Sequence, residues 1–399
     1  MDGFFIRFGK QYGKTKAMKT KACIVVSSPM TIEAFLQDQI RAMNVLYETS
    51  VVANAPDGDF LKKLNIHVRF MGVPLKRQVC LLADVHALCS LLLIFLRERF
   101  QIVHSITPKA GLLGMGAAFF ARVPVRVHTF TGQVWATKSG VARAVLRFLD
   151  KLIAGFATHV LVDSCSQRKF LIENGVLSKQ KSCVLGDGSI SGVNTLRFRP
   201  NPEARRKFRE KYKIPDQDMV FVYVGRLKRD KGIPELLAAF EKIAKTNSSM
   251  WLLLVGPDEE NLGSLIQASP AITKTIMVGH TSSPELYLAA SDVIVLPSHR
   301  EGFGSSVIEA AACGIPAVTA RIYGLTDAVV DGKTGLFHEA GDVDGLISVM
   351  LQLGLNTELR QRLGSNARER ALQSFSMGKM TAHVMSFYSS IVSNRTVAS

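Results

Sequence analysis

Short apolar runs alternate with longer segments of mixed polarity along most of the chain. Each run is only a few residues long and rich in Val, Ile and Leu. Such runs predict strands that are buried on both faces, as in a parallel sheet. We expect strands at 23–26, 46–52, 67–70, 102–105, 125–130, 160–164, 219–224, 251–255, 276–280 and 293–297.

The segments between the runs carry apolar residues at helical spacing. We expect helices at 31–45, 61–64, 83–100, 111–120, 139–156, 203–211, 285–290, 343–373 and 376–392, and a turn at 331–337. Alternating strands and helices are typical of α/β domains with parallel sheets, whose ligands lie at the carboxyl ends of the strands.

The length of 399 residues is sufficient for two such domains. A Gly- and Ser-rich stretch at 186–194 is the expected linker. We therefore expect a basic leader at 1–21, a first domain at 22–190, a second domain at 191–375 and a terminal helical segment at 376–399. The leader is either disordered or in contact with a membrane.

Two carboxylates follow the last predicted strand. Glu301 lies in a loop with Gly302 and Gly304, which let the backbone approach a ligand closely. Ser305 and Ser306 are expected to cap the next helix, which carries Glu309 about one turn inside. Free amides at a helix N-terminus suit an anion or a hydroxyl-rich ligand. Either glutamate alone is also compatible with a solvated or helix-capping role.

Two cations follow the strand at 219–224. Gly225 and Arg226 come directly after it, and Lys231 lies five residues further on, before a helix that begins near Pro234. The arginine donates two hydrogen bonds in a fork, and the lysine adds a point charge, so the pair suits a diphosphate. The alternative is a solvated basic turn.

His128 lies at the C-terminal end of the strand predicted at 125–130, before the loop Thr131-Gly132-Gln133. A lone histidine is commonly a structural group, but this position at the ligand edge favours a role in a site.

The positive charge is concentrated in the first half of the chain. Residues 1–192 hold 25 Lys and Arg against 12 Asp and Glu, a net of +13, whereas residues 193–399 have a net of +3. This favours an anionic partner such as lipid, nucleic acid or a phosphorylated substrate, or else serves solubility. No nucleic-acid motif is present.

The segment 139–156 combines an apolar stripe with Arg143, Arg147 and Lys151. It fits either a packed helix or a helix that lies on an anionic membrane surface. No apolar run is long enough to span a bilayer, and no signal peptide is expected. Six cysteines without metal-ligand spacing indicate a reduced cytoplasmic setting.

The segments around Glu301 and Glu309 resemble glycosyltransferase family 4, whose members are retaining enzymes of the GT-B fold. The similarity extends over residues 22–390. It implies two Rossmann-like parallel-sheet domains facing a central cleft, with a terminal helix that crosses back to the first domain. The implied donor-binding residues are Gly225, Arg226, Lys231, Gly279, His280, Glu301, Gly302, Phe303, Gly304, Ser305 and Glu309.

The resemblance assigns the diphosphate to Arg226 and Lys231, the donor sugar to Glu301, and the nucleotide ribose to Glu309. It places His128 near the acceptor and the transferred sugar, with Ser27, Ser28, Thr131 and Gly132 on the acceptor side. Members of the family often have a glycine pair where this chain has Ser27 and Ser28.

The implied reaction is retaining transfer of a hexosyl or N-acetylhexosaminyl group from a UDP-linked donor, without a cofactor or a metal. We read Asp57-Gly58-Asp59 and Asp342-Val343-Asp344 as turn and helix-cap residues. The segment 129–135 is similar to bacterial enzymes that build O-antigen or capsule on polyprenyl diphosphate. We therefore expect a cytoplasmic enzyme at the inner face of the plasma membrane. The alternatives are a GT-B sugar-nucleotide epimerase and a catalytically silent sugar-nucleotide-binding subunit.

Overall fold

The chain forms two compact units in a computed structural model that describes residues 19–76, 78 and 80–396. The first unit extends to Ser191 and includes the chain again from Gly378, and the second comprises Gly192–Met377. Most of the predicted basic leader, residues 1–18, lies outside the described residues.

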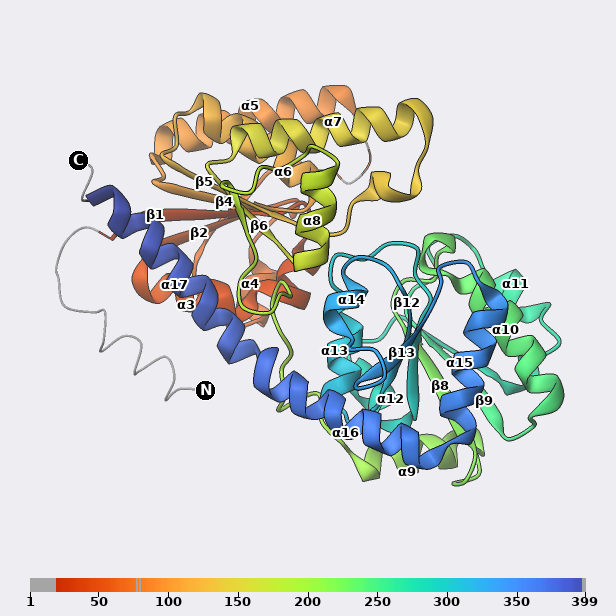
Figure 1. Cartoon of the computed structure of the whole chain (residues 1–399). Helices are drawn as coiled ribbons and strands as arrows, with labels where there is room; N and C mark the ends of the chain where they lie inside the picture. Colours follow the sequence, from red (N-terminus) through yellow and green to blue (C-terminus); the bar gives the residue numbers. More distant parts are fainter. Residues whose placement is uncertain (1–18, 77, 79, 397–399) are drawn as a thin grey trace. The chain divides into compact units, whose positions relative to one another are not determined.

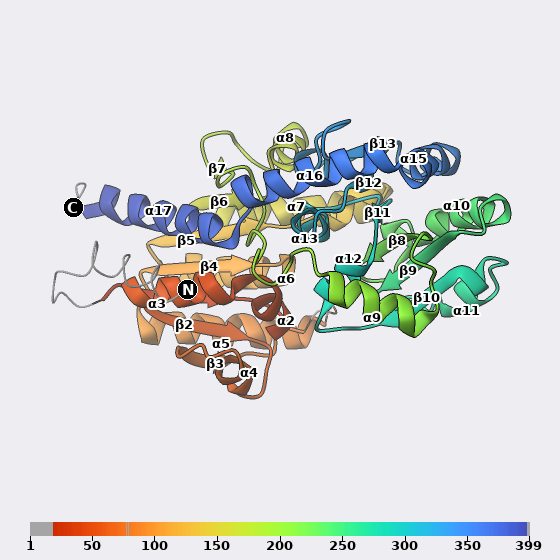
Figure 2. The ribbon, with the colours of Figure 1, turned by 90° about the horizontal axis from the view of Figure 1, so that it is seen from below.

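The first unit is built on a seven-stranded parallel sheet with the order β3-β2-β1-β4-β5-β6-β7 (Figure 2). Its strands are β1 (Lys21–Val25), β2 (Glu48–Ala53), β3 (Arg69–Gly72), β4 (Ile102–Ile106), β5 (Val125–Phe130), β6 (His159–Val162) and β7 (Ser182–Cys183). Its helices are α2 (Pro29–Thr31), the π-helical η1 (Ile32–Leu36), α3 (Gln37–Leu46), α4 (Asp59–Lys63), α5 (Leu81–Glu98), α6 (Pro108–Phe120), η2 (Val134–Thr137), α7 (Gly140–Phe156), α8 (Cys165–Glu173) and α17 (Met377–Thr396).

Two apolar cores cover the two faces of this sheet. Helices α5, α6 and α7 lie on one face, where Leu91 and Phe95 are buried (Figure 1). Helices α3 and α17 lie on the other face, and Ile40 packs there with Tyr388 (Figure 1). The end of the chain therefore completes the core of the domain that the beginning of the chain builds.

The second unit has a six-stranded parallel sheet with the order β10-β9-β8-β11-β12-β13. Its strands are β8 (Met219–Val224), β9 (Met250–Val255), β10 (Thr275–Gly279), β11 (Val293–Leu296), β12 (Ala317–Ala320) and β13 (Gly335–His338). Its helices are α9 (Pro202–Tyr212), η3 (Arg229–Lys231), α10 (Ile233–Thr246), α11 (Gly263–Gln267), η4 (Ile272–Lys274), α12 (Pro284–Ala290), α13 (Ser305–Ala312), α14 (Leu325–Ala328), α15 (Val343–Leu355) and α16 (Thr357–Ser374).

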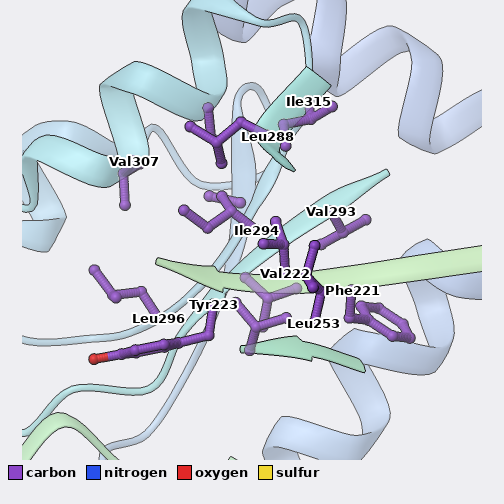
Figure 3. Packing of buried hydrophobic residues seen from close by; sticks show 14 of the residues in the cluster. Phe221, Val222, Tyr223, Leu253, Leu288, Val293, Ile294, Leu296, Val307 and Ile315 are labelled. Atoms are coloured by element: carbon purple, nitrogen blue, oxygen red, sulfur yellow. The ribbon is translucent and has the colours of Figure 1, made fainter. Parts of the chain in front are cut away.

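The core of the second unit is formed by its central strands and the helices on both faces. Val222, Leu253 and Ile294 come from three neighbouring strands, lie opposite one another in the parallel ladder and pack together (Figure 3). Val307 of α13 and Leu288 of α12 join this cluster (Figure 3). Helices α10 and α15 lie together on the opposite face (Figure 1). This packing fixes the strands whose carboxyl ends carry the candidate site.

The helical segment expected at 343–373 is confirmed as two helices that meet at Asn356, whose side chain caps α16. Two other expectations about secondary structure were wrong in part. The turn expected at 331–337 contains the edge strand β13, which pairs in parallel with β12. The helix expected at 31–45 contains a π-helical turn between α2 and α3. Over the residues described, no helix combines the length and apolar character that crossing a bilayer requires.

Candidate active site

The exits of β8 and β11 form the centre of the candidate site in the second unit. The sheet grows from β8 through β9 to β10 on one side and from β11 through β12 to β13 on the other. Strand order therefore reverses between β8 and β11, and ligands of parallel α/β sheets bind at such a switch point. Arg226 follows β8 and Glu301 follows β11, so the sheet places the predicted cations and carboxylates at one edge.

The cation-bearing loop after β8 is held by close backbone packing. The Tyr223 hydroxyl donates to the Arg226 carbonyl at 2.8 Å. Gly232 begins α10 with a φ of +73°, and a Cβ there would lie 2.2 Å from the carbonyl oxygen of Pro297. Only glycine fits both the positive φ and this approach. The loops after β8 and β11 are therefore in direct contact.

Lys231 and Glu301 form an ion pair across this contact. The Lys231 Nζ lies 2.7 Å from the Glu301 Oε1 and 3.2 Å from the Arg300 carbonyl oxygen. The Ser298 hydroxyl donates to the same carboxylate oxygen at 2.9 Å. Lys231 is only 9% exposed, so the pair is strongly shielded from solvent. The sequence predicted both residues but not that they pair.

An ion pair and a hydrogen bond position the loop that carries Glu301. Arg300 contacts Asp230 at 2.7 Å, and the His299 Nε2 lies 2.8 Å from Glu235. Burial acts to raise the pKa of Asp230, but Arg300 and Lys231 outweigh it, and this pKa lies below its ordinary value. The Asp230 carboxylate is therefore ionised and anchors the loop at neutral pH.

Helix α13 begins without a side-chain cap. Its N-cap residue is Gly304, with a φ of +85°, so the expected capping by Ser305 and Ser306 was wrong. A Cβ on Gly304 would lie 2.5 Å from the Leu325 side chain, which excludes a larger residue. Phe303 is buried and packs against Phe375 at 5.2 Å between ring centroids. Only the backbone of Phe303 is thus available to a ligand.

Glu309 is a destabilised carboxylate on α13. Burial raises its pKa to about 7, Arg197 acts in the opposite direction, and Glu285 adds to the increase. Arg197 itself is paired with Glu285 at 2.7 Å. Among the residues that the structure describes, no cation forms an ion pair with Glu309, and a buried carboxyl group of this kind is typical of a ligand-binding position.

Gly302 lies in the loop after β11, and three further predicted donor residues lie at the exits of β8 and β10. Gly225 has a φ of +158°, and Gly279 has a φ of +75° and accepts a hydrogen bond from the Gly256 amide at 2.9 Å. His280 is exposed next to Gly279. Since β10, β9 and β8 are consecutive in the sheet, these residues share the edge that carries Arg226.

The predicted acceptor-side serines follow β1 in the first unit. The Ser27 hydroxyl pairs with that of Thr107 at 2.9 Å, and the Ser28 hydroxyl accepts from the Met30 amide at 3.3 Å. Thr107 connects β4 to α6 with a φ of +77°, which is strained for a β-branched residue. The Ser27 hydroxyl therefore links the loop after β1 to the loop after β4, and Ser28 caps the helix that follows β1.

His128 is almost fully buried on β5. Its Nδ1 shares a 2.8 Å hydrogen bond with the Ser105 hydroxyl, and its ring meets Phe130 edge to face at 4.5 Å between centroids. Gly111 of α6 makes room for the imidazole, because a Cβ there would lie 2.4 Å from the His128 Cε1. Burial, assisted by His104, lowers the pKa of His128 to about 3, so the ring is neutral.

The loop after β5 is closed by two buried glutamines. The Thr131 carbonyl accepts from the Gln133 side chain at 2.7 Å and also from that of Gln167. The Gln167 amide further donates to the Gln133 side-chain oxygen at 2.9 Å. Gln167 thus fixes the loop that contains Thr131 and Gly132, although it lies more than thirty positions away in the sequence. This loop follows β5, the strand that carries His128.

Comparisons with known proteins identify the family of this chain. The family descriptions "Glycosyl transferase 4-like domain" and "Glycosyl transferases group 1" match residues 31–188 and 204–370. The capsular polysaccharide biosynthesis glycosyltransferase CapM of Staphylococcus aureus is 33% identical over 344 residues, which are 84% of this chain and 88% of CapM. The chain belongs to the group 1 glycosyltransferases.

This glycosyltransferase also resembles a second bacterial enzyme and solved structures of the same fold. The UDP-Gal:alpha-D-GlcNAc-diphosphoundecaprenol alpha-1,3-galactosyltransferase of Escherichia coli is 27% identical over 348 residues, 85% of this chain and 88% of that enzyme. The crystal structure of Anabaena HepE in complex with UDP-glucose has a TM-score of 0.77 at 20% identity, covering 93% and 99% of the two chains. The predicted family and GT-B fold class are confirmed.

Several residues of the glycosyltransferase site escaped sequence reasoning. Ser105 and Gly111 hold His128, and Ser298 holds Glu301, but each is a small residue inside a predicted element or loop. Glu259 lies in the loop after β9, and its carboxylate is 3.0 Å from the Arg226 guanidinium. Its only signal was its place directly after a buried strand.

The acidic pairs considered for metal binding make local contacts in this glycosyltransferase. The Asp57 carboxylate accepts from the Asp59 amide at 3.0 Å, and Asp342 caps α15 through the Gly345 amide. The readings of a turn and a helix cap are confirmed. Within residues 19–76, 78 and 80–396, no three His, Cys, Asp or Glu side chains are grouped in a way that suits a metal ion.

Proposed function

We propose that this glycosyltransferase transfers a sugar, with retention of anomeric configuration, from a UDP-linked donor to a saccharide on polyprenyl diphosphate during bacterial surface-glycan synthesis. The observation that carries the proposal is the shielded Lys231–Glu301 pair at the switch point, next to Arg226. Cations for a diphosphate and a carboxylate for sugar hydroxyls are there in one place. The Escherichia coli relative, whose name specifies UDP-Gal and a diphosphoundecaprenol acceptor, supports this choice of donor and acceptor.

In the proposed mechanism the second unit holds the donor. Arg226 and Lys231 bind the diphosphate and stabilise the negative charge that grows on it as the glycosidic bond breaks. This stabilisation makes a divalent metal unnecessary in the proposal. Glu301 accepts hydrogen bonds from the donor sugar, and Glu309 accepts them from the ribose. Backbone amides at the open N-terminus of α13 complete the contacts.

The acceptor is assigned to the first unit, where His128 supplies a neutral imidazole at the sheet edge. Retention follows in this proposal when the acceptor hydroxyl attacks the face of the sugar from which the diphosphate departs. The departing diphosphate takes the proton of that hydroxyl. The paired carboxylates of hydrolases act differently, by protonating and attacking the sugar.

A product assay tests this proposal. UDP- and GDP-linked sugars are screened with a synthetic polyprenyl-diphosphate GlcNAc acceptor in EDTA, and the product anomer is read by NMR. We expect a UDP-sugar to react and to keep its α configuration. Arg226→Ala and Lys231→Ala should lower kcat/KM by about 100-fold or more, while Glu241→Gln on α10 should leave it unchanged. Inversion, a requirement for metal, or conversion of the donor without acceptor would refute the proposal.

We also propose that the first unit docks on an anionic membrane. Helix α7 exposes Val141, Val145 and Phe148, whose exposed fractions are 79%, 50% and 57%. The expected apolar stripe is therefore packed only in part, at Leu146 and Ile153. Helix α5, on the same face of the sheet, exposes Leu81 and other apolar residues (Figure 1). Exposed apolar side chains in a unit rich in Lys and Arg suit a membrane interface.

Vesicle pelleting tests the docking separately from catalysis. Arg143 stacks on Trp135 at 5.3 Å and is left unchanged. The variant with Val141, Val145 and Phe148 changed to Ser should lose binding to vesicles with 30% anionic lipid, while keeping activity on a short-chain soluble acceptor. A matched triple change to Ser at exposed Leu265, Leu286 and Leu355 of the second unit should still pellet. Equal pelleting of both variants would refute the docking surface.

A further inference from the structure

The loops after β8 and β9 are joined by backbone hydrogen bonds beside the candidate diphosphate site. The Leu227 amide donates to the Pro257 carbonyl at 2.9 Å, and the Glu259 amide donates to the Leu227 carbonyl at 3.3 Å. Gly256 permits this approach, because a Cβ there would lie 1.9 Å from the Gly225 carbonyl oxygen. An acidic loop is thus fixed against the loop that carries Arg226.

The acidic loop neutralises the cations of its neighbour. The Glu259 Oε2 lies 3.0 Å from the Arg226 Nη1 and 3.7 Å from the Lys228 Nζ. Glu260 lies 3.5 Å from the same lysine and accepts from the Arg229 amide at 2.9 Å. The Glu259 carboxylate therefore contacts both cations, of which Arg226 is the closer.

A carboxylate and a phosphate compete for the same guanidinium. Both accept the paired N–H groups of arginine through two oxygens. Lys231 is likewise paired, with Glu301, which has a proposed role toward the donor sugar. Glu259 has no proposed role toward the donor, yet its carboxylate accepts an Arg226 N–H that could otherwise be donated to a phosphate oxygen.

We propose that Glu259 is a displaceable stand-in for the donor diphosphate. It pairs with Arg226 when the site is free of nucleotide, and it moves to Lys228 when the diphosphate arrives. The inference rests on the proposed function, in which Arg226 binds that diphosphate. This competition lowers the affinity of the site for the nucleoside diphosphate. After the reaction, the Glu259 carboxylate returns to Arg226 and displaces the nucleoside diphosphate product.

The size of the effect follows from exposure. The Arg226 and Glu259 side chains are 36% and 30% exposed, so their pair is of the weak, solvent-screened kind. The competition is expected to change nucleotide affinity by a factor of about two to five.

Calorimetric titration with UDP, and with GDP as a second probe, tests the inference. Glu259→Gln should bind UDP about two- to fivefold more tightly than the unchanged chain, and its inhibition constant for UDP as product should fall by the same factor. Glu259→Asp, whose shorter side chain retracts from Arg226, should shift in the same direction. Glu241→Gln makes the same change in net charge at an exposed pair with Lys245 and should leave UDP affinity unchanged.

The outcomes separate the inference from the proposed function. If Glu259→Gln binds UDP as the unchanged chain does, or more weakly, while Arg226→Ala loses binding, the stand-in role is refuted and the function stands. If Arg226→Ala keeps full affinity for both nucleotides, the proposed diphosphate site itself is refuted. A purely structural Glu259 would not produce tighter binding together with an unchanged melting temperature.

Discussion

Replacing Glu309 with glutamine should stabilise this glycosyltransferase at alkaline pH and impair its use of donor. Burial raises the pKa of Glu309 from 4.5 to about 7. The folded state therefore keeps a proton that the unfolded state releases between these two values, and stability contributed by this group falls as pH rises through that window. One pKa unit corresponds to about 1.4 kcal/mol, so the full shift corresponds to about 3 kcal/mol.

The residue keeps some exposure, which reduces the expected cost of ionised Glu309 to about 2 kcal/mol at pH 8. Glutamine has the same shape and no charge, so Glu309→Gln should avoid this cost. For a unit of this size the gain corresponds to a rise of roughly 5 °C in melting temperature at pH 8. At pH 4.5 the two proteins should melt within about 1 °C of each other, because the folded protein then carries a neutral Glu309.

Calorimetric scans of both proteins between pH 4.5 and 8.5 measure this difference directly. Glu241→Gln, at an exposed pair on α10, is the control for loss of one negative charge and should show no growing gap. The same preparations are assayed for the KM of the donor, which should rise in Glu309→Gln. A pH-independent gap, or a variant less stable than the parent at pH 8, would show that the carboxylate is well solvated and the reasoning wrong.

Three other changes test the packing of the two units, each by urea denaturation and activity. Glu301→Gln should cost about 1–3 kcal/mol because it leaves shielded Lys231 without its counter-ion. Adding Lys231→Met should recover stability but not activity, and a destabilised double variant would contradict this. Gly111→Ala should cost about 1–3 kcal/mol, since its Cβ would meet His128 at 2.4 Å; unchanged stability would show that the imidazole can move. Tyr388→Phe should cost about 1–2 kcal/mol by leaving buried His104 without its partner on α17, and Phe387→Leu is the neighbouring control that keeps this hydrogen bond.

The sequence predicted the sheet edges better than the contacts made there. Buried parallel strands are continuous apolar runs, so the expected strands at 125–130 and 219–224 coincide with β5 and β8. The candidate site residues directly after these strands, Arg226 and the loop at 131–133, were predicted for the same reason. Strand β13 was missed because it is a short edge strand that begins with Gly335 directly after a turn.

Pairing within the site could not be predicted, because it depends on strand order. Lys231 and Glu301 are 70 residues apart and meet only since β8 and β11 are neighbours. Glu259 reaches Arg226 through the equally unpredicted contact between two strand exits. The start of α13 was also predicted wrongly. Serine is a common N-cap residue, but the N-cap position is occupied by Gly304, which packs closely against Leu325.

The position of α17 has a consequence for synthesis of the chain. Met380, Val384 and Tyr388 bury an apolar face of the first unit, but the ribosome makes them only after the whole second unit. During translation α3 covers part of that face, and the part that lies under α17 stays exposed until the second unit has been made. The nascent protein therefore exposes an apolar surface during that time, and we expect chaperones to bind it. A stop codon ahead of α17 leaves the proposed donor-binding residues of the second unit in place, but it removes the helix that covers part of the core of the first unit.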